Sequence, residues 1–193
     1  MKGDKLDVAI NIGDLEVKSS DHVRNLGVIF DKAINLEKHI NTVCRNANHQ
    51  IRNIGLIRKY LDTDTTKTLV HALVTSRLDY CNALLYKSKK CLIQKLQRVQ
   101  NTAARLITKI RKYDHITDAR MKLHWLPIEQ RIEFKILLLT FKAINGHAPA
   151  YISELIEFKK PNRYSTRSTN GFQLARIDAV SNYGERAFPE RCI

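Results

Sequence analysis

Short strands are predicted near the N-terminus, where apolar and polar residues alternate along the chain. The alternation covers residues 6–10, 15–18 and 23–30, and turn-forming clusters separate the three stretches. A sheet this small is marginally stable by itself and needs another surface on which to pack. The sequence therefore predicts a β-hairpin or meander within residues 6–30.

Amphipathic helices are predicted after Asp31, where the hydrophobic period changes from two to about 3.6. Three long helices are expected, over residues 36–60, 62–86 and 89–110. Asp62 and Ser88 are suited to cap the second and the third helix. The side chains predicted to face inward are Leu36, Ile40, Val43, Ala47, Ile51 and Ile54, then Leu69, Val70, Leu73, Leu78, Cys81 and Leu85, and finally Leu92, Leu96, Val99, Ala103, Leu106 and Ile110. Three such helices with short joints form a compact bundle.

Further helices are predicted beyond a linker that contains Lys112-Tyr113-Asp114-His115 and a turn at residues 123–126. Pro127 suits the first position of a fourth helix, and the Asn145-Gly146 pair suits its end. A short fifth helix is expected to start at Ala148-Pro149. From Pro161 the chain is rich in Ser, Thr, Asn and Arg without a sustained period, which predicts an irregular tail.

The predicted fold class is mainly α, with a short N-terminal β-hairpin or meander, a bundle of about five helices and an irregular C-terminal tail. No strand is expected between residues 64 and 110. The core is predicted to contain Leu73, Leu96, Val99, Leu106, Ile136 and Leu137.

Composition agrees with a globular chain, because 44% of the 193 residues are hydrophobic and 27% are charged. No stretch approaches the roughly 18 apolar residues of a membrane span, and the first twenty residues contain no apolar signal segment. A cytoplasmic or nuclear location without a membrane partner is expected.

Positive charge is concentrated in one part of the chain. The formal net charge is +14, and residues 36–112 carry 16 Lys and Arg against 4 Asp and Glu, which leaves +12 of the total in this segment. A folded segment with that density of positive charge favours a polyanionic partner, nucleic acid first and an acidic membrane second.

Two basic rows lie opposite the predicted apolar faces. The row on the first helix contains Lys38, Arg45, Arg52 and Lys59, and the row on the third contains Arg98, Arg105, Lys109 and Lys112. Exposed helix faces are often basic simply because they are solvated, but such faces usually mix both signs of charge. The first helix contains a single acidic residue, Glu37, and the third contains none. This excess of basic over acidic residues on both helices favours contact with a phosphate backbone.

Catalytic chemistry has little support in the sequence. Sites that hold divalent ions need clustered carboxylates, and the chain contains no two adjacent acidic residues. Helix capping accounts for Asp62 and Asp64, and pairing along a helix accounts for Glu129 and Glu133. The sequence therefore predicts no catalytic residue, no metal, no cofactor and no small-molecule substrate.

The cysteine and histidine residues give no site signature either. Cys44, Cys81, Cys91 and Cys192 are spaced widely and irregularly, which suits neither a zinc knuckle nor a disulfide framework. The run His124-Trp125-Leu126-Pro127 is interpreted as a packed turn in which the single Trp anchors the chain.

Several segments of the sequence resemble segments of a known protein family. Those that carry it are Val23-Arg24-Asn25-Leu26-Gly27-Val28-Ile29-Phe30-Asp31, Leu69-Val70-His71-Ala72, Ser76-Arg77-Leu78-Asp79-Tyr80-Cys81-Asn82-Ala83-Leu84-Leu85-Tyr86, Leu96-Gln97-Arg98-Val99-Gln100-Asn101, Ala103-Ala104-Arg105-Leu106, Tyr113-Asp114-His115-Ile116 and Leu123-His124-Trp125-Leu126-Pro127. In this order they resemble the C-terminal part of non-LTR, LINE-type and jockey-like retrotransposon reverse transcriptases.

The resemblance implies a role for each part of the chain. Asn25, Leu26 and Gly27 would correspond to the primer grip, the hairpin that positions the primer end. Residues 1–31 would be a β remnant of the palm, residues 32–112 a thumb-like three-helix bundle, residues 113–160 a helical extension and residues 161–193 the tail. The partners expected are RNA, DNA or an RNA–DNA hybrid.

The family's catalytic aspartate pair precedes the primer grip, so the chain is expected to begin after it. Three hypotheses for the function of the chain remain open. It is a non-catalytic nucleic-acid-binding fragment of an RNA-directed DNA polymerase, an inert structural or interaction remnant, or a subunit completed in trans by a separate palm domain.

Overall fold

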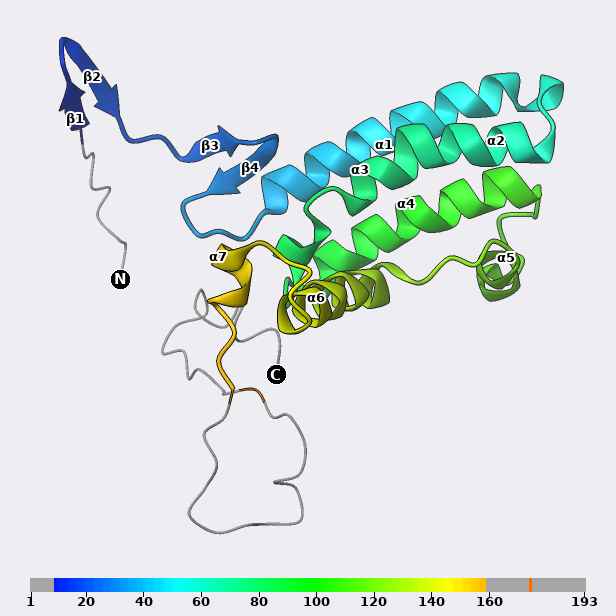
Figure 1. Cartoon of the computed structure of the whole chain (residues 1–193). Helices are drawn as coiled ribbons and strands as arrows, with labels where there is room; N and C mark the ends of the chain where they lie inside the picture. The colour runs from blue at the N-terminus through cyan, green and yellow to red at the C-terminus, as the bar shows by residue number, and fades with distance from the viewer. Residues whose placement is uncertain (1–8, 159–173, 175–193) are drawn as a thin grey trace, which may run out of the picture. The chain divides into compact units, whose positions relative to one another are not determined.

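The computed structural model describes residues 9–158 and Leu174 (Figure 1). The chain divides into two compact units, Met1–His39 and Ile40–Ile193. The expected irregular tail at residues 161–193 lies outside the described residues except for Leu174, which forms an isolated antiparallel bridge with Phe158. Among the described residues, no helix combines the length and the apolar character that crossing a membrane requires.

The first unit contains two antiparallel β-hairpins. One pairs β1 (Ala9–Ile12) with β2 (Leu15–Lys18), and the other pairs β3 (His22–Asn25) with β4 (Val28–Asp31). The second hairpin corrects the prediction of one continuous strand over residues 23–30. Its chain reverses at Leu26 and Gly27, whose φ angles of 46° and 85° suit the primed turns of two-residue hairpins.

Contacts within this unit join β4 to the start of the first helix. The Asp31 carboxylate accepts a hydrogen bond from the Leu36 amide at 2.9 Å, and the Ile29 amide donates to His39 Nδ1 at 3.5 Å. Burial lowers the pKa of His39, which favours the neutral ring that can accept this bond. Val28 and Leu36 are each only 2% exposed, so the β3–β4 hairpin has a packed side.

The rest of the described chain is helical, which confirms the predicted mainly α fold. The elements are α1 (Glu37–Ile57), η1 (Arg58–Tyr60), α2 (Thr63–Val70), η2 (His71–Thr75), α3 (Ser76–Asp79), η3 (Asn82–Leu85), α4 (Lys90–Thr108), α5 (Ile116–Lys122), α6 (Ile128–Ile144) and α7 (Ala150–Ser153). As predicted, the structure has no strand between residues 64 and 110, all of which it describes.

The predicted second helix is interrupted. A π-helical turn occupies η2 between α2 and α3, and Cys81 then adopts a left-handed conformation with φ of 51° before η3 begins. The reversal turns Cys81 to the surface, so its predicted inward position is wrong. Asp62 caps α2 as expected, because its carboxylate accepts from the amides of Asp64 and Thr65.

Two further expectations about helix ends and linkers need correction. The N-cap residue of α4 is Lys89, which makes no capping side-chain bond, so Ser88 does not act as the predicted cap. Residues 116–122, expected to be part of a linker, form α5. This helix is short and only Ala119 in it is buried, so its hydrophobic period is too brief to be recognised.

Helices α1 and α4 lie side by side and run in the same direction. Near their starts, Lys95 Nζ donates to Asn41 Oδ1 at 2.8 Å, and after the end of α1 the Arg58 side chain bonds to the Leu106 and Ile107 carbonyls. Helix α4 also contacts α2, α5 and α6, which makes it the centre of the bundle.

The predicted core is right at three positions. Leu96, Val99 and Ile136 are buried, whereas Leu73 and Leu106 are half-buried. Leu137 is 61% exposed, so its predicted place in the core is wrong. Helix α6 is apolar on most of its circumference, so the hydrophobic period could not show which face is buried.

Candidate nucleic-acid interface

The basic row on α1 is exposed along its whole length. Lys38, Arg45 and Arg52 are seven residues apart on α1, and Lys59 follows in η1. A seven-residue step rotates the position by only about 20° around a helix, so the side chains form a nearly straight row. Lys59 Nζ lies over its neighbouring ring, 4.7 Å from the centroid of Tyr60.

The basic row predicted on the third helix is shorter than expected. Helix α4 ends at Thr108, Lys109 closes it in a left-handed conformation with φ of 56°, and Lys112 lies beyond the helix. Only Arg98 and Arg105 are therefore on α4, which corrects the four-residue stripe. Lys109 and Lys112 are exposed, and Lys112 Nζ lies 5.7 Å from the Tyr113 ring centroid.

Arg105 is more constrained than Arg98. Its side chain is half-buried, and Nη2 donates to the Asp114 carbonyl oxygen at 3.3 Å. Arg98 is exposed, and within the described residues no hydrogen bond or ion pair engages the side chains of Arg98, Arg45 or Arg52. These three guanidinium groups can therefore reach a partner without first breaking another bond.

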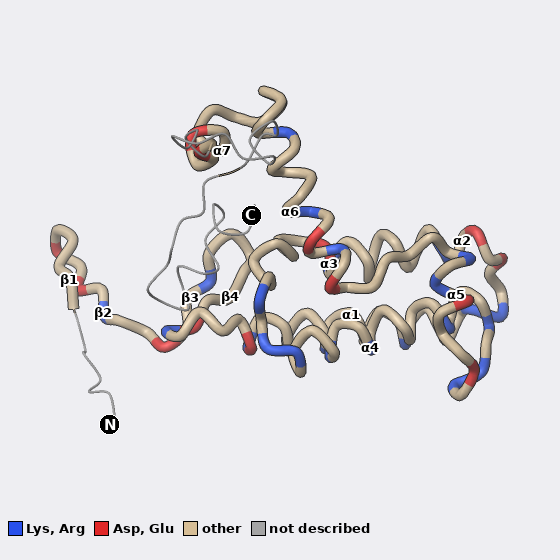
Figure 2. Tube along the Cα trace, turned by 90° about the horizontal axis from the view of Figure 1, so that it is seen from below, with Lys and Arg blue, Asp and Glu red and all other residues tan. Residues whose placement is uncertain are grey.

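The two rows face the same side of the bundle. Asn41 and Lys95 mark the edges along which α1 and α4 meet. A helix turns by about 100° per residue, so Arg45 and Arg98 both project to the solvent side of that seam, opposite the core positions Ile54 and Leu96. Lys and Arg recur along both helices in Figure 2. We call Arg45, Arg52, Arg98 and Arg105 the basic face.

The turn expected to act like a primer grip is exposed at the tip of the β3–β4 hairpin. Asn25 and Gly27 are exposed, and Leu26 is 84% exposed with an apolar side chain. The positive φ angles of Leu26 and Gly27 make a tight reversal in which the backbone of Gly27 can be approached closely. This turn belongs to the first compact unit and the basic face to the second.

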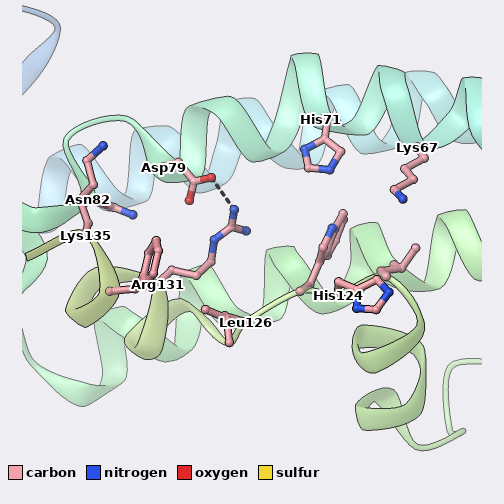
Figure 3. Close-up of a pocket in the computed structure, with 11 residues that line it drawn as sticks. Lys67, His71, Asp79, Asn82, His124, Leu126, Arg131 and Lys135 are labelled. Atoms are coloured by element: carbon pink, nitrogen blue, oxygen red, sulfur yellow. Dashed lines mark hydrogen bonds and ion pairs between the residues drawn. The ribbon is translucent and has the colours of Figure 1, made fainter. Parts of the chain in front are cut away.

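A cleft that the sequence did not predict lies between the α2–η2–α3 run and residues 123–135 (Figure 3). Its volume is about 460 Å³, and its polar lining includes Lys67, His71, Asp79, Asn82, Arg131 and Lys135. Arg131 Nη2 forms an ion pair with Asp79 Oδ2 at 2.5 Å. The His71 and Trp125 rings meet edge to face, with centroids 5.8 Å apart. We call it the α2–α6 cleft.

Electrostatics within the α2–α6 cleft centre on Asp79. Burial raises the pKa of this carboxyl, and its electrostatic interactions with Arg131, His71 and Lys135 oppose the rise. No sequence pattern marks this site, because its residues come from two segments more than forty positions apart and form no motif. Trp125 is buried as expected for a packed turn, yet its ring also lines the cleft.

The described part of the chain contains no candidate metal site, because no three of its His, Cys, Asp or Glu side chains are placed to hold an ion. Cys44, Cys81 and Cys91 are free thiols, and burial raises the pKa of Cys44 although Lys95 opposes the rise.

Comparisons of the chain with protein-family models, curated proteins and solved structures give no match.

Proposed function

We propose that this chain is the non-catalytic, nucleic-acid-binding part of a polymerase like those of non-LTR retrotransposons, and that its thumb-like helices hold a template–primer duplex. The basic face carries this proposal, because it joins cations from two parallel helices on one side of the bundle. The partner is RNA, DNA or an RNA–DNA hybrid, and the contacts are with phosphates rather than with bases.

The chemistry of the basic face suits phosphate binding. Arginine offers planar, paired donors that match phosphate oxygens, and its charge persists at every physiological pH. Residues seven apart on a helix are separated by about 10.5 Å, so the row from Arg45 to Lys59 can follow a strand over several phosphates. No acidic residue interrupts it, because Glu37 is the only acid on α1 and α4 has none.

Arg45 and Arg98 are the residues of the basic face best suited to a mutational test. Arg105 bonds to the Asp114 carbonyl, so its replacement would alter the loop after α4 as well as the charge. Arg45 and Arg98 have no such role and represent the two helices equally. Glutamine at these positions removes the charge and keeps a strong helix former.

The test is a salt titration with a fluorescent RNA–DNA hybrid duplex, read by anisotropy. The wild-type chain should bind with a Kd on the order of micromolar near physiological salt. The Arg45→Gln/Arg98→Gln variant should bind about tenfold more weakly, and its plot of log K against log salt should be flatter by about two, since each lost phosphate contact removes about 0.9 from the slope.

A matched control removes two exposed positive charges elsewhere. Arg77→Gln/Lys142→Gln changes α3 and α6 by the same net charge, so its slope should stay closer to that of the wild type. Circular dichroism should be the same for all three proteins. An equal loss in both variants would mean that only overall charge matters, and an unchanged slope in Arg45→Gln/Arg98→Gln would return the basic face to a solubilising role.

A further inference from the structure

Three buried polar atoms around the α2–α6 cleft have no hydrogen-bond partner among the described residues: Asn82 Oδ1, Trp125 Nε1 and Arg131 Nη1. Asn82 and Trp125 are only 5% and 8% exposed. Buried polar groups are almost always hydrogen-bonded, because an unmade bond is costly. One acceptor and two donors at one cleft are therefore placed to bond to a molecule that enters it.

The backbone departs from regular geometry at the edges of the same cleft. The π-helical turn η2 begins at His71, and Cys81 and His124 adopt left-handed conformations with φ of 51° and 55°. His71 and His124 line the cleft, and Cys81 directly precedes Asn82. π-Helical turns and strained non-glycine residues are enriched at ligand sites, where they aim particular side chains.

The charges of the cleft favour an anion. Its lining contains three cations, Lys67, Arg131 and Lys135, and one carboxylate, Asp79. Arg131 pairs with Asp79, so the two lysines account for the excess positive charge. Twelve residues of nearly continuous helix separate Lys67 from Asp79, a distance of about 18 Å. Lys135 lies at the Asp79 end, close enough to lower the pKa of that carboxyl, so Lys67 and Lys135 are toward opposite ends of an elongated cleft (Figure 3).

Aromatic and aliphatic side chains complete the lining between these charges. Trp125, Phe134, Leu123 and Leu126 contribute apolar surface, and Trp125 offers both a ring and an N–H donor. An inorganic anion would leave this surface and the Asn82 acceptor without a partner. An apolar ligand would leave both lysines and the unpaired donors without one.

We propose that the α2–α6 cleft binds a nucleoside phosphate, either as a free nucleotide or as one unit of a single strand. The phosphate meets a lysine, the base lies against the aromatic surface, and hydroxyl or amino hydrogens donate to Asn82 Oδ1. Acceptor atoms of the base or sugar receive bonds from Trp125 Nε1 and Arg131 Nη1. Stacking on aromatic rings beside cations is a general means of holding unpaired nucleotides.

This site is separate from the basic face. The two share no residue, and they lie on different sides of α4. On the cleft side, Gln100 donates to the Leu126 carbonyl, whereas Arg98 projects to the solvent side next to α1. The cleft proposal does not depend on duplex binding, so each can fail alone.

The single tryptophan of the chain provides a local readout, since Trp125 lines the cleft. Titration with AMP should change its fluorescence in a saturable way, and calorimetry should give the same Kd. Adenosine, which lacks the phosphate, should bind at least tenfold more weakly. The Lys67→Gln/Lys135→Gln variant should bind AMP about tenfold more weakly than the wild type, whereas Arg77→Gln/Lys142→Gln should bind it unchanged.

A trinucleotide of adenylate distinguishes the two sources of the ligand. Tighter binding than AMP supports a single strand, and equal or weaker binding supports a free nucleotide. The proposal is overturned if neither AMP nor the trinucleotide produces saturable binding, if adenosine binds as tightly as AMP, or if Lys67→Gln/Lys135→Gln keeps the wild-type Kd. An AMP Kd that weakens equally in Arg45→Gln/Arg98→Gln would assign binding to the basic face instead and overturn it too.

Discussion

Arg58 is a buried cation whose side chain bonds to backbone carbonyl groups. It is 7% exposed, and it donates to the carbonyl oxygens of Leu106, Ile107 and Leu61 at 3.0, 3.0 and 2.7 Å. The last carbonyls of a helix lack partners within the helix and carry partial negative charge. Arg58 supplies donors to the end of α4 and holds η1 against it.

Replacing Arg58 by leucine should therefore lower the stability of the helical bundle. We expect the Arg58→Leu variant to lose about 2–4 kcal/mol of unfolding free energy, because three carbonyls lose a charged donor in a buried place. Arg58→Lys should fall between this variant and the wild type, since an ammonium group lacks the planar fork. Denaturant unfolding followed by circular dichroism measures the differences.

The adjacent Lys59 provides the control for this experiment. Its side chain is exposed, so Lys59→Leu should change stability by no more than about 0.5 kcal/mol. Equal stability of Arg58→Leu and Lys59→Leu would show that the three bonds contribute nothing to the folded state.

At the scale of elements, a pair of glutamines on α4 sets the start of α6. Gln97 Oε1 accepts from the Ile128 amide at 2.9 Å, Gln97 Nε2 donates to Gln100 Oε1 at 2.8 Å, and Gln100 Nε2 donates to the Leu126 carbonyl at 2.8 Å. Pro127 occupies the N-cap of α6 without a capping side chain. A neighbouring helix thus provides the cap that the local sequence lacks.

Loss of these glutamine hydrogen bonds should destabilise the first turn of α6. Gln100 is 1% exposed, so the Gln100→Leu variant leaves the Leu126 carbonyl without its donor and removes one of the two acceptors of Gln97 Nε2, which also donates to Asn101. We expect a loss of about 1–3 kcal/mol in unfolding free energy. Amide hydrogen exchange measured by mass spectrometry should become faster at residues 126–130 while α1 stays protected.

Gln94 allows a matched comparison on the same helix. It is exposed on α4, and Gln94→Leu should leave exchange at residues 126–130 as it is in the wild type. Uniformly faster exchange across all helices in Gln100→Leu would indicate general destabilisation and contradict a local cap.

For the molecule as a whole, binding of nucleic acid and catalysis require different kinds of residue. Residues 36–112 carry +12 of the net charge of +14, which suits binding. Two-metal phosphoryl transfer requires clustered carboxylates, and the described residues contain no such group. The proposed function assigns this chain the holding of nucleic acid, and it predicts that the chain does not extend a primer.

A primer-extension assay checks this division. The purified chain should retard a labelled primer–template in a gel and add no nucleotide to it in the presence of Mg²⁺. A reverse transcriptase in the same buffer serves as the positive control. Metal-dependent incorporation that disappears on mutating an Asp of this chain would contradict the proposal.

The long helices and their exposed rows could be predicted because their determinants are local. Helices α1, α4 and α6 begin and end within a few residues of the expected positions, since apolar side chains recur along each of them. The exposure of Arg45 and Arg52 follows from the same period. The break at Cys81 escaped prediction, because a single left-handed residue leaves no pattern around it.

The hydrophobic period of the sequence was enough to locate the long helices and to show that α1 and α4 carry basic residues opposite apolar stripes. These features depend on residues within a few positions of one another. Three other features became visible only in the folded chain: Arg58 caps the end of α4, Leu137 faces outward, and Asp79 meets Arg131 across the α2–α6 cleft. Each of these depends on helices distant in sequence, whose mutual placement is set by packing rather than by local periodicity.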